Sequence, residues 1–136
     1  MPKLRILSIV FMLMFVFGIM SATWAQSGPV MYFCEKYDKG ETGISDRFTT
    51  GYITVIVICK HALGLTDVTI QFDKYNIKTG NFEYYKDFPY TISPDMDFIY
   101  FEGNDLSFDE PGIYRVFLLN EKRKTVTSAL IEIVSK

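Results

Sequence analysis

The sequence predicts an all-β fold, a single-domain antiparallel β-sandwich of about seven strands that follows an N-terminal signal peptide. Three observations support this prediction. Short runs of β-branched and aromatic residues recur along the chain, and one of them, residues 68–73, has clean apolar–polar alternation. Clusters of Gly, Pro, Asn and Asp separate these runs. No segment after the leader has the apolar period of an amphipathic helix.

The first 25 residues have the pattern of a secretory signal peptide. Residues 1–5 are short and basic, residues 6–20 are almost purely apolar, and small residues at Thr23 and Ala25 fit cleavage after Ala25. An uncleaved membrane anchor is the alternative, but the apolar run is short for a span of about 20 residues. We therefore expect a secreted or periplasmic protein without a membrane span after cleavage, whose β-sandwich domain is residues 26–136.

The charge of the expected mature chain argues against two classes of partner. Lys3 and Arg5 leave with the signal peptide, so twelve basic residues face sixteen acidic ones and the net charge is −4. A mildly acidic chain without a basic cluster argues against binding to nucleic acid or to anionic membrane surfaces.

The first two strands are expected at residues 30–37 and 52–59. The first is rich in β-formers and is followed by a polar loop over residues 38–46, which contains two glycines. The second is the strongest strand prediction in the chain. It is apolar on both faces, as expected for a central strand.

The middle of the chain predicts two further strands. In residues 68–73, apolar Val68, Ile70 and Phe72 alternate with polar residues, which indicates a half-buried strand. Residues 78–81 have the composition of a hairpin turn. An aromatic and less regular strand follows at residues 82–90.

The last three strands are expected at residues 98–101, 113–119 and 125–134. A longer loop precedes the second of these, and a polar hairpin loop at residues 120–124 follows it. Arg115 is the one charged residue in 113–119, so this strand is expected to be central and covered on much of both faces.

The approach to strand 113–119 resembles a known corner. Pro111-Gly112 has turn chemistry, because Pro presets one dihedral and Gly permits positive φ. With Tyr114, the stretch 108–116 resembles the approach to strand F in bacterial-type immunoglobulin-like and fibronectin-like domains, where a Tyr hydroxyl bonds back to the backbone. The resemblance implies a seven-strand immunoglobulin-like sandwich and says nothing about function. Antibody domains differ, because this chain lacks their core Trp and their cysteine positions.

Cys34 and Cys59 are the two cysteines, and both lie in the expected mature chain. An even number in an exported protein predicts a disulfide between them, which would stabilise the fold by about 3 kcal/mol if unstrained. The alternative is a pair of free thiols, which are common in strands.

No residue pattern predicts catalysis, a cofactor or a bound metal. His61 is the one histidine, so a copper site with two His and a Cys cannot form. Cys59 and His61 are two residues apart and could form a nucleophile pair, but we interpret them as a strand-end His beside a structural Cys. The sequence contains no hydrolase or phosphate-loop motif. We therefore expect a protein that is not an enzyme.

Acidic residues flank the strand at residues 98–101. Oxygen ligands from flexible loops suit Ca²⁺. The EF-hand spacing is absent, so we interpret these residues as solvated turn residues rather than a calcium site. They are Asp95, Asp97, Asp105, Asp109 and Glu110.

Aromatic residues concentrate over residues 84–101, and alternate positions of a strand face outward. The candidate interaction surface consists of Tyr84, Tyr85, Phe88, Tyr90 and Tyr100. Packing of these rings in the core is the competing interpretation. We expect a non-catalytic interaction or accessory module whose partner is another exported or envelope protein, or a second copy of itself. The alternative is a domain that binds a glycan or a small ligand.

Overall fold

The computed structural model describes residues 28–103 and 106–136, so the expected signal peptide lies outside the described residues. The described chain is all-β. Its strands are β1 (Val30–Cys34), β2 (Lys36–Tyr37), β3 (Glu41–Thr42), β4 (Arg47–Thr49), β5 (Gly51–Tyr52), β6 (Thr54–Ile58), β7 (Asp67–Asn76), β8 (Asn81–Thr91), β9 (Phe98–Phe101), β10 (Ser107–Phe108), β11 (Gly112–Leu119) and β12 (Thr125–Val134). No helix in residues 28–103 or 106–136 is long and apolar enough to cross a membrane.

Seven of these strands, β1, β6, β7, β8, β9, β11 and β12, lie on the runs predicted from the sequence. The other five are two or three residues long and lie in or beside segments expected to be loops or strand ends. Strands this short contain too few residues to show an alternating pattern.

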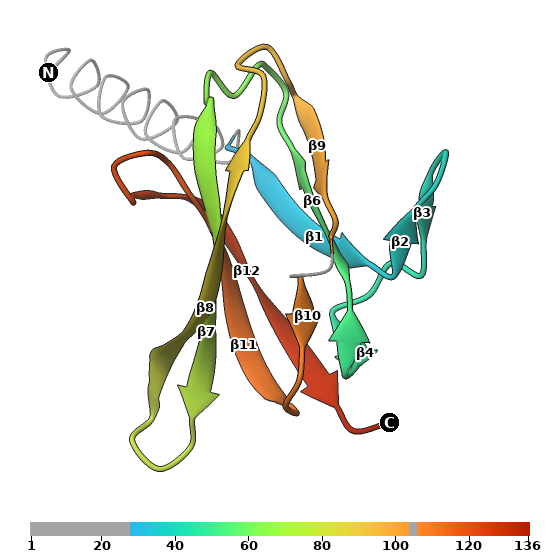
Figure 1. Ribbon diagram of the computed structural model, residues 1–136, viewed down its shortest axis with the longest axis vertical. Coiled ribbons are helices and arrows are strands. Elements are labelled where there is room, and N and C mark those ends of the chain that lie inside the picture. The colour runs from blue at the N-terminus through green and yellow to red at the C-terminus, as the bar shows by residue number, and fades with distance from the viewer. Residues whose placement is uncertain (1–27, 104–105) are drawn as a thin grey trace, which may run out of the picture.

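The larger sheet has five strands in the order β4-β12-β11-β7-β8 (Figure 1). β11 pairs with both β12 and β7, so the strand at 113–119 is central, as predicted. β4 pairs with β12 in the parallel direction, which corrects the expectation of a purely antiparallel fold. The parallel pair forms because the chain leaves β1 in the smaller sheet and joins the larger one beside its last strand.

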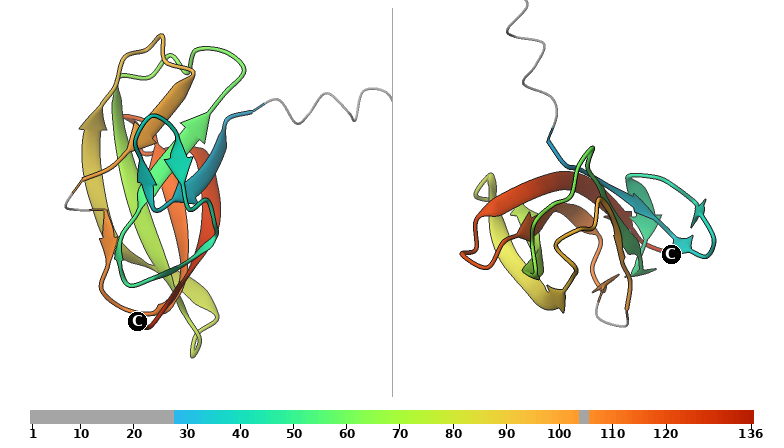
Figure 2. Two further views of the ribbon diagram at one scale, coloured as in Figure 1. Left: turned by 90° about the vertical axis from the view of Figure 1, so that its right-hand side faces the viewer. Right: turned by 90° about the horizontal axis from the view of Figure 1, so that it is seen from above.

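The smaller sheet has the order β1-β6-β9, with β6 in the centre as predicted. β5 directly precedes β6 and pairs with β10, and the Ile53 amide extends this pairing by bonding to the Leu106 carbonyl. The β2–β3 hairpin forms a separate two-stranded sheet that lies beside the smaller sheet (Figures 1 and 2).

One hydrophobic core lies between the two main sheets, an arrangement compatible with a β-sandwich. The smaller sheet contributes Phe33, Val55, Val57, Ile99 and Phe101 to it, and the larger sheet contributes Ile70, Phe72, Tyr114, Val116, Leu118, Ile131 and Ile133. These residues alternate along their strands, so each strand directs one face inward.

The corner before β11 has the predicted hydrogen bond. Tyr114 is fully buried, and its hydroxyl donates to the Glu110 carbonyl at 2.7 Å. Gly112 has φ of +153°, a conformation that residues with a side chain rarely adopt. The turn predicted at Pro111-Gly112 and the hydrogen bond of Tyr114 therefore lie together at the start of β11.

The expected disulfide between Cys34 and Cys59 is wrong, since both are free cysteines. In the antiparallel β1–β6 pair, Cys34 lies opposite Thr54, whereas Val30 lies opposite Ile58. The two cysteines therefore lie at opposite ends of the pair, about 15 Å apart at the usual rise per residue. A disulfide requires Cα atoms within about 7 Å.

Candidate interaction surface

The side of the larger sheet that faces away from the core is the candidate site, and we call it the outer face. Strand register places its side chains in rows that cross β12, β11, β7 and β8. One row contains Leu130, Arg115, Asp73 and Tyr84, and the next contains Ser128, Phe117, Gln71 and Asp87. A third row begins with Glu132 and Ile113 and ends with Tyr75 and Phe82.

Half of the outer face is apolar and open to solvent. Ile113 is 45% exposed and Leu130 is 50% exposed, although both lie within β-strands. The Tyr75 and Phe82 rings lie 5.3 Å apart, and the Arg115 guanidinium lies over Phe82 at 5.0 Å from the ring centroid. Outward positions of a solvated sheet are usually polar, so this half is an apolar patch with a cation above one of its rings.

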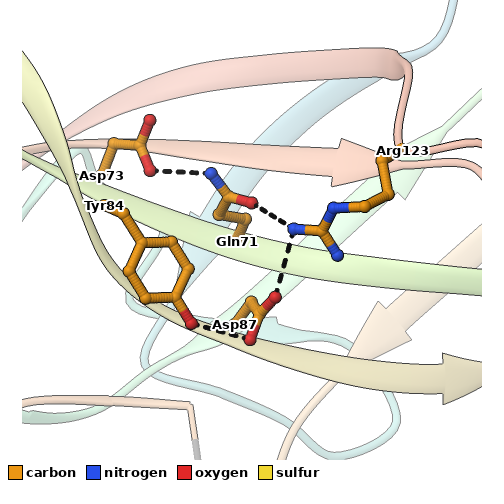
Figure 3. A network of polar contacts seen from close by, with 5 residues as sticks. All are labelled: Gln71, Asp73, Tyr84, Asp87 and Arg123. Atoms are coloured by element: carbon orange, nitrogen blue, oxygen red, sulfur yellow. Dashed lines mark hydrogen bonds and ion pairs between the residues drawn. The ribbon is translucent and has the colours of Figure 1, made fainter.

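A polar network occupies the other half of the outer face (Figure 3). Arg123 donates to the Gln71 side-chain oxygen at 2.9 Å and to the Asp87 carboxylate at 3.2 Å. Gln71 donates its amide to Asp73 at 2.9 Å, and the Tyr84 hydroxyl donates to Asp87 at 2.9 Å. The bond to the Asp87 carboxylate raises the pKa of Tyr84, because it favours the protonated phenol.

The turn between β11 and β12 holds Arg123 over this network. Arg123 has φ of +59°, and its amide bonds to the Asn120 carbonyl. The Asn120 side chain accepts the amides of Lys122 and Lys124. A side chain that bonds to its own turn in this way fixes a conformation that non-glycine residues seldom adopt. These bonds therefore fix the turn that carries Arg123.

Four of the five predicted surface residues lie on β8, but only one of those four is on the outer face. Tyr84 is 62% exposed there, whereas Tyr85, Phe88 and Tyr90 are half-buried and pack against the core. For these three residues the structure agrees with the competing interpretation, packing of the rings against the core.

A β-bulge in β8 explains the division. Phe72 lies opposite Lys86 and Asp73 lies opposite Tyr84, so Tyr85 is an extra residue in the pairing. A bulge of this kind changes which face the following residues occupy. Tyr84 and Tyr85 lie on different faces by the ordinary alternation of a strand, and the bulge then directs Phe88 and Tyr90 toward the core instead of the face of Tyr84. Tyr85 contacts Tyr114 edge-to-face with 5.2 Å between ring centroids.

The fifth predicted residue, Tyr100, lies on the other sheet. It is 45% exposed on β9 and stacks on Tyr37 with 4.4 Å between ring centroids. Tyr37 also contacts Phe98, so the β2–β3 hairpin places one aromatic ring over two from β9. Tyr100 therefore belongs to a separate cluster and does not extend the outer face.

Sequence reasoning missed the apolar members of the outer face, Tyr75, Phe82, Ile113 and Leu130. A usable signal was present in β11, where Ile113, Arg115 and Phe117 alternate with the buried positions. The same signal led to the expectation that β11 is covered on much of both faces. On the outer face this expectation holds in part, since Ile113 is exposed, Phe117 is half-buried and Leu119 is buried.

An open groove of about 500 Å³ lies along β9 and the end of β8. Its lining includes Tyr90, Ile92, Met96, Tyr100 and Glu102. Apolar walls with a few polar groups are usual for small-molecule sites.

The acidic residues around β9 do not assemble into a metal site among the described residues, where no group of three or more His, Cys, Asp or Glu side chains could hold an ion. Asp105, which the sequence analysis considered, lies outside the described residues. Asp109 instead pairs with Lys86 at 3.7 Å, and Glu110 pairs with Lys74 at 2.6 Å.

No protein-family model matches the chain, and no curated protein sequence matches it.

Proposed function

We propose that this protein is an exported, non-catalytic interaction module that binds another exported protein through the outer face. The observation that supports the proposal is the combination of exposed apolar residues on that face with a pre-positioned Arg123. Interface centres favour Tyr, Phe and Arg, whereas free surfaces seldom contain a contiguous apolar patch. A partner with an apolar centre and flanking carboxylates would complement this face.

The topology supports an immunoglobulin-like sandwich as the scaffold. The order β12-β11-β7-β8 corresponds to strands G, F, C and C′ of such domains, and β1-β6-β9 corresponds to A, B and E. Within the described residues no strand corresponds to D. The Tyr114 corner before β11 agrees with the assignment of β11 to strand F.

The test compares two substitutions of equal size at different places. The face variant is Ile113→Lys with Leu130→Lys, and the control is Ile44→Lys with Ile58→Lys, whose side chains are 62% and 38% exposed and lie beside and on the smaller sheet. Tagged protein is used to capture partners from the envelope and secreted fractions of the source, and each partner is then titrated as a purified protein.

We expect the face variant to weaken binding at least about thirtyfold, the effect of losing about 2 kcal/mol at an interface centre. The control should bind within about twofold of the unmodified protein. Equal binding by the two variants would show that the partner does not bind at the outer face. Binding of the protein to itself in sedimentation, lost in the face variant, would identify a second copy as the partner.

The groove beside β9 favours a second candidate, the binding of a glycan or small ligand. Tyr100 lines it with its ring partly exposed, and the Glu102 carboxylate could accept hydrogen bonds from hydroxyl groups. A panel of sugars titrated against tyrosine emission tests it. A saturable change that Tyr100→Ala abolishes would support a ligand site, and a flat response across the panel would exclude the sugars tested.

A further inference from the structure

The segment directly after β6 contains a cysteine and a histidine in direct contact. The Cys59 sulfur lies 3.3 Å from Nδ1 of His61. The Cys59 amide donates to the Asp97 carbonyl at 2.8 Å, which fixes the backbone that carries the thiol. Cys59 is partly exposed and His61 is exposed, so a reagent in solution can reach the sulfur.

The second cysteine is a natural comparison within the same chain. Cys34 is fully buried, and its thiol contacts the Lys36 carbonyl at 3.4 Å. Burial raises the pKa of the Cys34 thiol, because the thiolate is poorly solvated there. A buried thiol of this kind is inert, whereas a partly exposed thiol beside a base meets the structural conditions for reactivity.

We propose that Cys59 is a reactive thiol that exchanges with disulfides outside its own fold, with His61 as the base. When the ring proton is on Nε2, Nδ1 accepts the thiol proton, and the sulfur attacks one sulfur of the incoming disulfide. The incoming S–S bond breaks, a mixed disulfide with Cys59 forms, and the departing thiolate takes up a proton. The incoming disulfide is the oxidant, so the step needs no other co-reactant.

This inference does not depend on the outer face, because the Cys59–His61 pair lies in the segment directly after β6, a strand of the other sheet. The structure excludes the internal partner, since Cys34 is buried at the far end of the β1–β6 pair. The partner sulfur must therefore come from a small disulfide or from a second protein chain.

The first experiment measures the rate at which the native protein reacts with 5,5′-dithiobis(2-nitrobenzoate) near neutral pH, followed by peptide mapping. We expect one thiol to react in the native protein, at Cys59, and both to react after denaturation. His61→Ala should slow the native reaction at least about tenfold, a bound set below the roughly hundredfold that a general base typically contributes. The circular dichroism spectrum and unfolding midpoint should not change.

Cys59→Ser is the matched loss variant and should abolish native labelling. A His61→Ala rate within twofold of the unmodified protein would overturn the role of His61. Native labelling at Cys34, or at neither cysteine, would overturn the proposal as a whole.

Two further arms distinguish the source of the disulfide. Incubation with oxidised glutathione tests a small disulfide, and intact mass should rise by one glutathionyl group that is absent from Cys59→Ser. Addition of unmodified protein to protein that carries glutathione on Cys59 tests a second chain: attack by the free Cys59 displaces glutathione, and the covalent dimer appears on a non-reducing gel but not with Cys59→Ser. Failure of both would contradict the exchange reaction.

Discussion

Removal of one hydroxyl, by Tyr114→Phe, tests the corner that positions β11. The Tyr114 ring is fully buried, lying 4.6 Å from the Phe108 ring and 5.2 Å from the Tyr85 ring between centroids. Phenylalanine retains these contacts, so the substitution removes mainly the hydrogen bond to the Glu110 carbonyl. The experiment therefore isolates a single polar contact within an unchanged apolar site.

The loss of stability depends on whether the Glu110 carbonyl finds another hydrogen-bond donor. A buried acceptor that loses its donor costs about 1–3 kcal/mol. Glu110 is exposed, so water can reach its carbonyl in part, and we expect about 1–2 kcal/mol. For a domain of about 110 residues this corresponds to a fall of about 4–8 °C in Tm.

Equilibrium unfolding in urea, followed by far-UV circular dichroism, measures this loss. The matched control is Tyr84→Phe, which removes a tyrosine hydroxyl bonded to Asp87 on an exposed surface. The free energy of unfolding of this control should stay within about 0.5 kcal/mol of that of the unmodified protein. Equal midpoints for Tyr114→Phe and the control would refute the argument that the corner bond stabilises the fold.

Four further predictions concern separate features. Burial, followed by the hydrogen bond to Glu41, raises the pKa of Tyr32 to about 12. The stability that Tyr32 contributes is therefore complete below pH 10 and is lost between about pH 10 and 12, which unfolding at stepped pH measures. Gly112→Ala should lower stability by about 1–2 kcal/mol in urea unfolding, because φ of +153° strains any side chain. In protein purified without exposure to oxidants, alkylation after denaturation without reductant should label both Cys34 and Cys59. A disulfide-linked peptide that contains both cysteines would contradict the free thiols. The exported protein should show tyrosine but no tryptophan emission, since Trp24 leaves with the predicted signal peptide.

The long strands could be predicted from the sequence because their patterns are local. Val68, Ile70 and Phe72 alternate in the sequence and are all buried in β7. The Tyr114 corner was also readable, since Pro111, Gly112 and the tyrosine are close in sequence and each has a defined conformational role.

The failures concern relations between distant residues. The disulfide failed because the register of β1 against β6 sets the distance between the cysteines, and register does not appear in residue spacing. The candidate aromatic residues of β8 do not share one face, because the bulge at Tyr85 reverses the alternation within that strand. A bulge depends on the pairing partner as well as on the strand that contains it.

The incomplete cover of the outer face of β11 bears on the proposed function. The strand is apolar on both faces, a pattern typical of burial on both sides. Its inward residues Val116 and Leu118 are fully buried against the core, whereas the described residues leave Ile113 on the outer face 45% exposed. Exposed apolar surface of this kind favours association, since covering it removes apolar area from water. The two-sided pattern of β11 therefore agrees with the proposal that a partner covers the part of its outer face that the chain itself leaves exposed.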